Sequence, residues 1–148
     1  MAETSIIGAV RDYIDTCPFL DEFAKIDVEY LSNEKDSYTV DALPGEPLVQ
    51  RYLNGDSEKQ FSFTFSSRKS YGPDVLQNLE NSGFYERFAD WLESESRNGN
   101  LPKLPEGKEA MSIRAISQGF VFQTDYDEAQ YQIQCRVLYY QKGAEQWQ

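Results

Sequence analysis

The sequence predicts an α+β domain in which a mostly antiparallel β-sheet packs against central helices. Three observations lead to this class. Strict alternation over residues 61–66 indicates a strand with one face of phenylalanines and one of hydroxyls. Residues 84–92 repeat large apolar side chains at the spacing of an amphipathic helix. A second alternating stretch, residues 129–141, indicates a long C-terminal strand. Strands and helices occur in separate runs, which is typical of α+β rather than α/β proteins.

The chain is expected to begin with a helix that Thr4 or Ser5 caps, and Pro18 either ends this helix or opens a short extra turn through Phe23. Its apolar residues recur at helical spacing, namely Ile6, Ile7, Val10 and Ile14. A strand over residues 26–30 follows, with alternate residues on opposite faces. We expect Ile26, Val28 and Tyr30 on one face and Asp27 and Glu29 on the other, which is exposed.

Three further strands complete the first half of the chain. One restarts the alternation at Tyr38 and Val40, after a polar turn. Another covers residues 49–53, after a loop rich in proline and glycine. It leads into Asn54-Gly55, a strong signal for a hairpin, and so pairs with the phenylalanine-rich strand.

Tyr71 to Asp74 opens a helical segment that we expect to be interrupted at Asn81-Ser82-Gly83 and to end at Asn98-Gly99. The inner face of the first part is expected to carry Val75, Leu76 and Leu79. The inner face of the second part is expected to carry Phe84, Phe88, Trp91 and Leu92, as core residues rather than as a surface that stacks bases.

A proline-rich loop over residues 99–109 precedes two predicted strands, residues 111–123 and 129–141. The predicted order is therefore helix, four strands, helices, two strands. A chain of 148 residues suits one domain, which we assign to residues 1–148.

Composition argues against several classes of function. The formal net charge of −11 disfavours sequence-specific nucleic-acid binding and docking on an anionic membrane. Histidine is absent, which removes the commonest general base and metal ligand. Cys17 and Cys135 are expected to be free thiols in a chain made in a reducing cytoplasm. No ligand-spaced carboxylate run and no phosphate-binding glycine run is present. We therefore assign no catalytic, metal-binding or cofactor-binding residues.

Charge is distributed unevenly along the chain. Residues 1–60 carry thirteen acids against five bases, whereas residues 61–148 carry twelve against nine. The two predicted C-terminal strands lack acids outside their turn, which indicates a surface that meets something acidic. The candidate interface therefore joins two groups: Arg114, Gln132, Gln134 and Arg136 on the C-terminal strands, and Asp27, Glu29 and Asp41 on the early strands. We expect these groups to lie on different parts of the subunit. A head-to-tail ring would then pair opposite charges and a two-fold dimer would pair like charges, so the charge layout favours a closed ring.

Several stretches of the chain resemble a family of minor capsid or tail-completion proteins of phages and prophages of Gram-positive bacteria. The similar stretches cover roughly residues 14–141, and Tyr71 to Glu93 is the most specific of them. The quoted segments are IDTCPFL from Ile14, PGEP from Pro44, YGPDVLQNLENSGFYERFADWLE from Tyr71 and YQIQCRVLYYQ from Tyr131.

The resemblance implies a structural virion protein at the head–tail joint, present in the host cytoplasm before assembly. The predicted order of elements is also similar to that of siphophage tail terminators, which form rings, commonly hexamers. The implied partners are further copies of the chain, the tail tube and head-completion proteins, with DNA passing through the ring lumen. Two other interpretations stay open: a small binding or adaptor module, and a histidine-free enzyme of unknown reaction.

Overall fold

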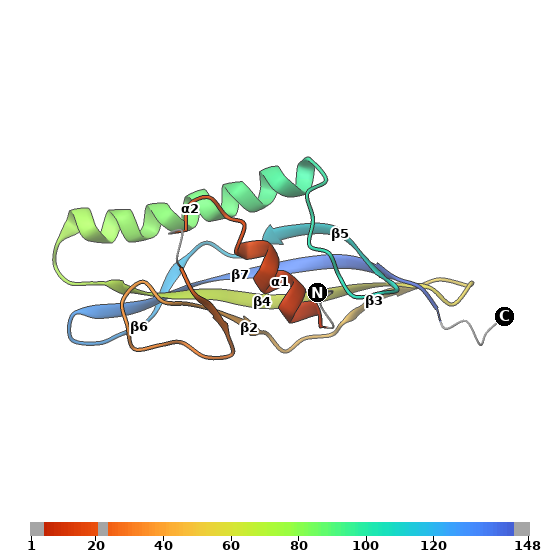
Figure 1. Ribbon diagram of the computed structural model, residues 1–148, viewed down its shortest axis with the longest axis horizontal. Helices are drawn as coiled ribbons and strands as arrows, with labels where there is room; N and C mark the ends of the chain where they lie inside the picture. Colours follow the sequence, from red (N-terminus) through yellow and green to blue (C-terminus); the bar gives the residue numbers. More distant parts are fainter. Residues whose placement is uncertain (1–4, 21–23, 144–148) are drawn as a thin grey trace.

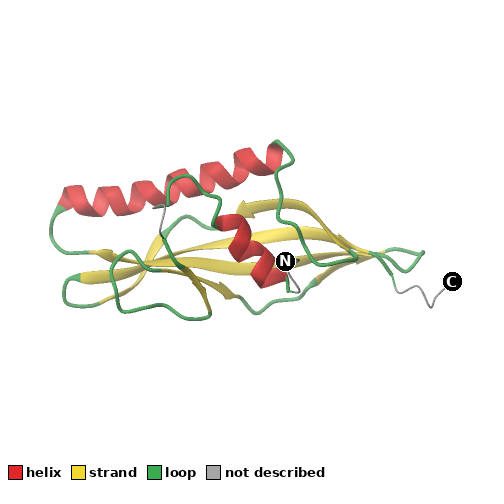
Figure 2. Ribbon diagram, in the orientation of Figure 1, coloured by secondary structure: helices red, strands yellow, loops and turns green. Residues whose placement is uncertain are grey.

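The computed structural model of the chain describes residues 5–20 and 24–143, and within them it has an α+β fold (Figures 1 and 2). A seven-stranded sheet is combined with two helices, which confirms the predicted fold class. The helices are α1 (Ile6–Ile14) and α2 (Val75–Arg97). The strands are β1 (Ile26–Val28), β2 (Tyr38–Ala42), β3 (Leu48–Arg51), β4 (Ser57–Ser70), β5 (Lys108–Ala115), β6 (Phe120–Thr124) and β7 (Glu128–Gln141).

The two longest strands, β4 and β7, form the centre of the sheet. They pair antiparallel over all 14 residues of each strand, from Ser57 opposite Gln141 to Ser70 opposite Glu128. Strands β2 and β3 pair with the other edge of β4, and β5 and β6 pair with the other edge of β7. Strand β1 lies outside β2 and is parallel to it, so the sheet is mixed.

The core lies between the helices and one face of the sheet, which we call the inner face. Phe63 and Phe65 of β4 are fully buried on this face, and the ring of Phe65 stacks on Phe88 of α2 at 4.6 Å between centroids. The predicted packing of the phenylalanine strand against the second helical segment is therefore confirmed. Strand β7 adds a continuous row of buried residues, namely Tyr131, Ile133, Cys135, Val137 and Tyr139.

Helix α1 forms where the sequence predicts it and ends at Ile14, before Pro18. Residues 18–20 form a turn, and the rest of the alternative extra turn through Phe23 lies outside the described residues. The Ser5 hydroxyl accepts a hydrogen bond from the backbone N–H of Gly8 at 3.1 Å and so caps the helix. Val10 and Ile14 are fully buried. The alternative cap, Thr4, lies outside the described residues.

Helix α2 is one continuous element of 23 residues, so the predicted interruption at residues 81–83 is wrong. Asn81 lies within this helix and is buried, and its side-chain amide donates a hydrogen bond to the backbone carbonyl of Ser70 at 2.8 Å, which satisfies the buried polar group. Asn81, which the sequence pattern favours at a helix break, thus instead anchors the continuous helix to the end of β4. The uninterrupted helix is about 34 Å long and runs along the long axis of the sheet (Figure 1).

The first turns of α2 overturn a second prediction. Val75, Leu76 and Leu79 do not line the inner face, because their side chains are 68%, 73% and 62% exposed. In a continuous helix each residue is rotated by about 100° from the last. This rotation places the three residues on the side opposite Phe88 and Leu92, and they therefore point away from the sheet.

Two further predictions need correction. The strand expected over residues 26–30 ends at Val28, because Glu29 adopts a left-handed backbone conformation (φ 58°) that ends the alternation. Val28 and Tyr30 are 38% and 65% exposed, so neither lies in the core. The strand expected over residues 111–123 is divided into β5 and β6. In the described residues the order is therefore helix, four strands, one helix, three strands.

Candidate functional site

The face of the sheet opposite the core, which we call the outer face, carries the predicted interface residues. The register of β4 and β7 places Ser62 beside Arg136, Thr64 beside Gln134 and Ser66 beside Gln132. These residues alternate with Phe63, Phe65, Ile133 and Cys135, which face the helices. Apart from Leu138, which pairs with Gln60, the outer face of β7 from Gln132 to Tyr140 and of β4 from Ser62 to Ser66 thus carries polar side chains.

One side of the outer face is basic. Arg114 of β5 lies directly opposite Arg136 of β7, so two like charges are cross-strand neighbours. Among the described residues, none of the ion pairs involves either arginine. Arg136 has a single long contact, from Nη1 to Oε1 of Gln60 at 3.5 Å, and its buried Nε has no hydrogen-bond partner there. We call Arg114 and Arg136 the arginine pair.

The other side of the outer face is acidic. Asp27 pairs in register with Thr39, and Asp41 lies two residues further along β2 and opposite Thr64. Glu29 lies just beyond β1, and its carboxylate accepts a hydrogen bond from the backbone N–H of Ala42 at 3.4 Å. Burial raises the pKa of Asp41, and the nearby negative charge of Glu29 raises it further. We call Asp27, Glu29 and Asp41 the acidic group.

Neutral side chains separate the two charged groups. Gln132 accepts from the Ser66 hydroxyl at 3.4 Å, and Gln134 lies next to Thr64. Primary amides both donate and accept hydrogen bonds, so Gln132 and Gln134 can adapt to a polar partner. The structure therefore brings the seven residues of the predicted interface together on one side of the sheet.

This arrangement corrects the charge argument drawn from the sequence. The two groups do not lie on different parts of the subunit. They share one face, with β2 only two strands from β7, or about 10 Å. A two-fold axis that runs along the strands between the groups would place the acidic group of each copy over the arginine pair of the other. The charges of this face alone therefore do not favour a ring over a two-fold dimer.

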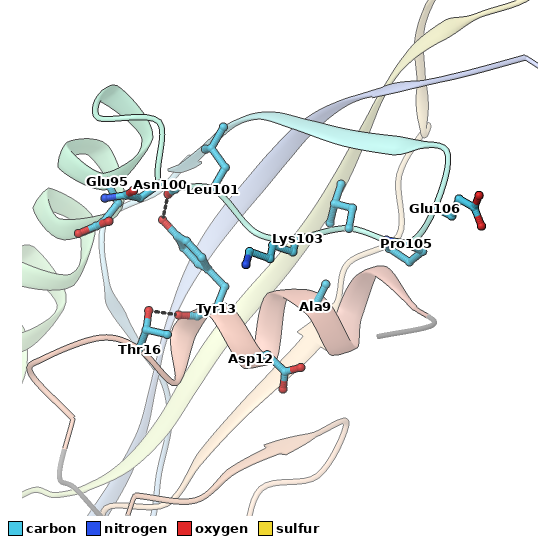
Figure 3. Close-up of a pocket in the computed structure, with 11 residues that line it drawn as sticks. Ala9, Asp12, Tyr13, Thr16, Glu95, Asn100, Leu101, Lys103, Pro105 and Glu106 are labelled. Atoms are coloured by element: carbon cyan, nitrogen blue, oxygen red, sulfur yellow. Dashed lines mark hydrogen bonds between the residues drawn. The ribbon is translucent and has the colours of Figure 1, made fainter. Parts of the chain in front are cut away.

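A second feature is a groove of about 640 Å³ between α1 and the loop of residues 100–106 (Figure 3). Tyr13 crosses it and donates from its hydroxyl to the backbone carbonyl of Asn100 at 2.7 Å. Burial raises the pKa of Tyr13, as does the neighbouring charge of Glu95, so this phenol acts as a donor and not as a base. The sequence signalled the loop through its prolines but not the groove, which needs the packing of α1 beside it.

The groove has the character of a binding surface. Its apolar lining comes from Ala9, Leu101, Leu104 and Pro105, and its charged rim from Asp12, Glu95, Lys103 and Glu106. The one hydroxyl beside Tyr13, that of Thr16, donates to a backbone carbonyl at 2.6 Å and has no base next to it. This lining contains no paired nucleophile and base of the kind that covalent catalysis uses.

Further observations limit what the described residues can hold. Cys17 and Cys135 are free and buried, and burial raises the pKa of both thiols. Within residues 5–20 and 24–143, no group of three or more acids, cysteines or histidines is arranged so that it could hold a metal ion. No described helix has the length and apolar character that crossing a bilayer requires.

Comparison with known proteins gives no assignment. No protein-family model matches the chain, and no curated protein is similar enough to count as a relative. The site must therefore be interpreted from its own geometry and charge.

Proposed function

We propose that this chain is a structural subunit of a tailed-phage virion that acts at the head–tail joint as a tail-completion or tail-terminator protein and assembles into a ring. The sequence resemblance of residues 14–141 supports the virion assignment. The arginine pair supports assembly, and it is the observation that carries the proposal. A ring subunit needs a surface that is incomplete in the monomer, and the arginine pair has this property.

The physical argument concerns the cost of the arginine pair. Like charges directly opposite each other on one sheet face destabilise the isolated fold. In the described residues no acid offsets this repulsion. Carboxylates of another subunit would offset it and would form charge-assisted hydrogen bonds with the guanidinium groups of the arginine pair. The arrangement is thus more favourable in an assembly than in a monomer.

The proposal assigns no catalytic residue, metal or cofactor to the chain. Its partners are other copies of itself, the tail tube and head-completion proteins. DNA is a passing cargo and not a ligand, since an acidic lumen repels the phosphate backbone and lets duplex slide. The chain is present in the host cytoplasm before assembly and in the virion afterwards.

Charge reversal tests the proposal. Arg114→Glu changes an exposed side chain on the outer face, and Arg51→Glu makes the same change at an exposed position of β3. We expect the wild type and Arg51→Glu to form rings in concentrated solution and to complete tails when they replace the phage gene product. Arg114→Glu should stay folded by circular dichroism and fail at both. Normal tail completion by Arg114→Glu would contradict the proposal.

A rescue experiment then asks whether the acidic group is the partner. The double variant Arg114→Glu, Arg136→Glu removes the arginine pair, and Asp27→Lys with Glu29→Lys reverses the acidic group. If the two groups meet across subunits, the four changes together should restore part of the assembly that the double variant loses. No restoration would show that the arginine pair meets other acids.

The groove beside α1 favours a second candidate function, that of a small binding or adaptor module. Leu101→Glu would place a charge on its apolar lining without touching the outer face. Loss of tail completion by Leu101→Glu, with ring formation intact, would favour this function over the first.

A further inference from the structure

We infer that the outward surface of α2 docks on the basic side of the outer face of a second copy of the chain. This inference rests on the proposed function, in which copies of the chain assemble with one another. It identifies the acids that meet the arginine pair and gives the assembly its direction.

The outward surface of α2 has an apolar part followed by an acidic part. Val75, Leu76 and Leu79 form the apolar part at the start of the helix, all three more than 60% exposed. Glu86, Asp90 and Glu93 continue the same side of the helix and are exposed. None of these three acids takes part in an ion pair among the described residues. We call these six residues the α2 ridge.

The outer face carries the complementary sequence of side chains. Phe120 of β6 pairs with Gln132 and so lies on this face, and exposed Ile116 continues the alternation of Arg114. The arginine pair follows. Apolar side chains thus lie towards the β6 end of the face, and positive charge lies next to them. On the α2 ridge, negative charge lies next to apolar side chains in the same way, so the two surfaces are complementary.

The spacing of the two surfaces agrees. Gln132, beside Phe120, is four residues from Arg136 on β7, or about 13 Å. Leu79 is seven residues from Glu86 and eleven from Asp90, or about 10 and 16 Å along the helix. Both α2 and β7 run in the same direction along the long axis (Figure 1). A second copy in the same orientation along this axis therefore brings apolar side chains together and acids onto the arginine pair.

The geometry also sets the type of assembly. The α2 ridge points away from the sheet on the helix side of the molecule, and the arginine pair lies on the other side of the sheet. One pair of subunits cannot make both contacts at once through these surfaces, so each contact leaves one ridge and one arginine pair free. Such head-to-tail contacts produce closed rings or open filaments, and not a two-fold dimer.

Cross-linking tests the contact without changing any charge. Ser94 is exposed and lies four residues beyond Asp90, or about 6 Å. Ser112 pairs with Leu138, two residues beyond Arg136, or about 7 Å. In the proposed contact these two serines of different copies are therefore close. The two native thiols are buried, so cysteines introduced at these positions can be linked selectively with a short bis-maleimide.

We expect Ser94→Cys alone and Ser112→Cys alone to give no covalent product. A mixture of the two single variants should give covalent dimers, and the variant with both changes should give a ladder of multimers. The matched control combines Ser94→Cys with Asn33→Cys, an exposed position in the loop before β2, and should give no ladder. Dimers from Ser112→Cys alone would show outer faces packed on each other and would overturn the inference.

Light scattering on the wild type and on charge variants separates this inference from the proposed function. Leu79→Lys and Asp90→Lys should each weaken self-association by about tenfold or more, whereas Asn33→Lys, at an exposed position in the loop before β2, should not. If wild-type oligomers form and dissociate on Arg114→Glu but tolerate both ridge variants, the inference fails and the proposed function stands. A chain that stays monomeric at millimolar concentration contradicts both.

Discussion

Arg114 and Arg136 occupy directly opposite positions on β5 and β7, with both side chains on the outer face of the sheet. Opposed like charges in a sheet reduce stability by an amount on the order of the 0.2–1 kcal/mol that favourable cross-strand pairs contribute. Since no acid of the described residues is paired with either arginine, the monomer bears this cost. The arginine pair is therefore a property of the fold that stability measurements can detect.

Removal of one charge should stabilise the monomer. We expect Arg114→Gln to raise the free energy of unfolding by about 0.2–1 kcal/mol in low salt, as measured by urea titration of dilute protein. The gain should shrink in high salt, because screening weakens the repulsion that the wild type suffers. Arg51→Gln is the matched control and should change little. A loss of stability in Arg114→Gln would mean that an attractive contact of Arg114 outweighs the repulsion.

The stacked rings of Phe65 and Phe88 give a second prediction. Phe65 is fully buried, so Phe65→Ala should lower the free energy of unfolding by about 3–5 kcal/mol through lost burial and a residual cavity. Phe122→Ala makes the same chemical change at a side chain that is 56% exposed, and should cost less than about 0.5 kcal/mol. Equal losses in the two variants would place Phe65 outside the core.

Helix α2 shows what sequence periodicity can and cannot decide. The apolar positions of residues 75–79 and of residues 84–92 differ in phase by about half a turn. One straight helix cannot bury both sets of apolar side chains on the same sheet. Two helices separated by a break could each turn their own set towards the core. The sequence favours that break, since Asn81, Ser82 and Gly83 are weak helix formers. The structure keeps the helix whole and exposes the first set, because Asn81 finds buried partners in β4 and β7 that single-helix patterns do not contain.

The outer face shows the same limit for strands. Alternation alone predicts which residues of one strand share a face, and it placed Gln132, Gln134 and Arg136 together correctly. It does not determine which strands are neighbours when they are far apart in the sequence. The proximity of the acidic group to the arginine pair depends on the pairing of β2 with β4 and of β4 with β7. The groove beside α1 likewise depends on a tertiary contact between residues 13 and 100.

The corrected orientation of α2 leads to a third prediction. Leu79→Ser should change the free energy of unfolding by less than about 0.5 kcal/mol, because Leu79 contacts solvent. Leu92→Ser, on the opposite side of the same helix, should cost at least about 2–5 kcal/mol, because Leu92 is fully buried. Thermal or urea unfolding of dilute monomer measures both. A large loss in Leu79→Ser would restore the interpretation that the sequence suggests.

Gly119, in the segment that separates β5 from β6, supports a fourth prediction. A Cβ atom at this position would overlap the side chain of Tyr85. Tyr85 cannot move easily, because its hydroxyl is hydrogen-bonded to Ser67 at 2.5 Å and its ring is buried. We therefore expect Gly119→Ala to lower the free energy of unfolding by about 1–3 kcal/mol. Gly45→Ala is the control, since a Cβ there meets nothing within 4 Å.

The last prediction concerns Asp56, which joins the β3–β4 hairpin to the end of the described chain. Its carboxylate accepts hydrogen bonds from the Tyr140 hydroxyl, from the backbone N–H of Gly143 at 2.7 Å and from the Asn54 amide at 3.1 Å. The Tyr140 bond is the largest cause that lowers the pKa of Asp56, followed by the Gly143 bond. The same bond raises the pKa of Tyr140.

A carboxyl group whose pKa is lower in the folded state stabilises the fold above its unfolded pKa, which is about 3.9 for aspartate. That contribution is lost as the pH falls through the folded pKa. We therefore expect the wild type to lose stability on acidification below about pH 4 more steeply than Asp56→Asn does. Tyr140→Phe should raise the pKa of Asp56 in an NMR titration of its carboxyl carbon, because the hydroxyl donor is gone. An unchanged titration in Tyr140→Phe would show that the Tyr140 hydroxyl does not lower the pKa of Asp56. A steeper loss of stability in acid by the wild type would then have to come from another titrating group.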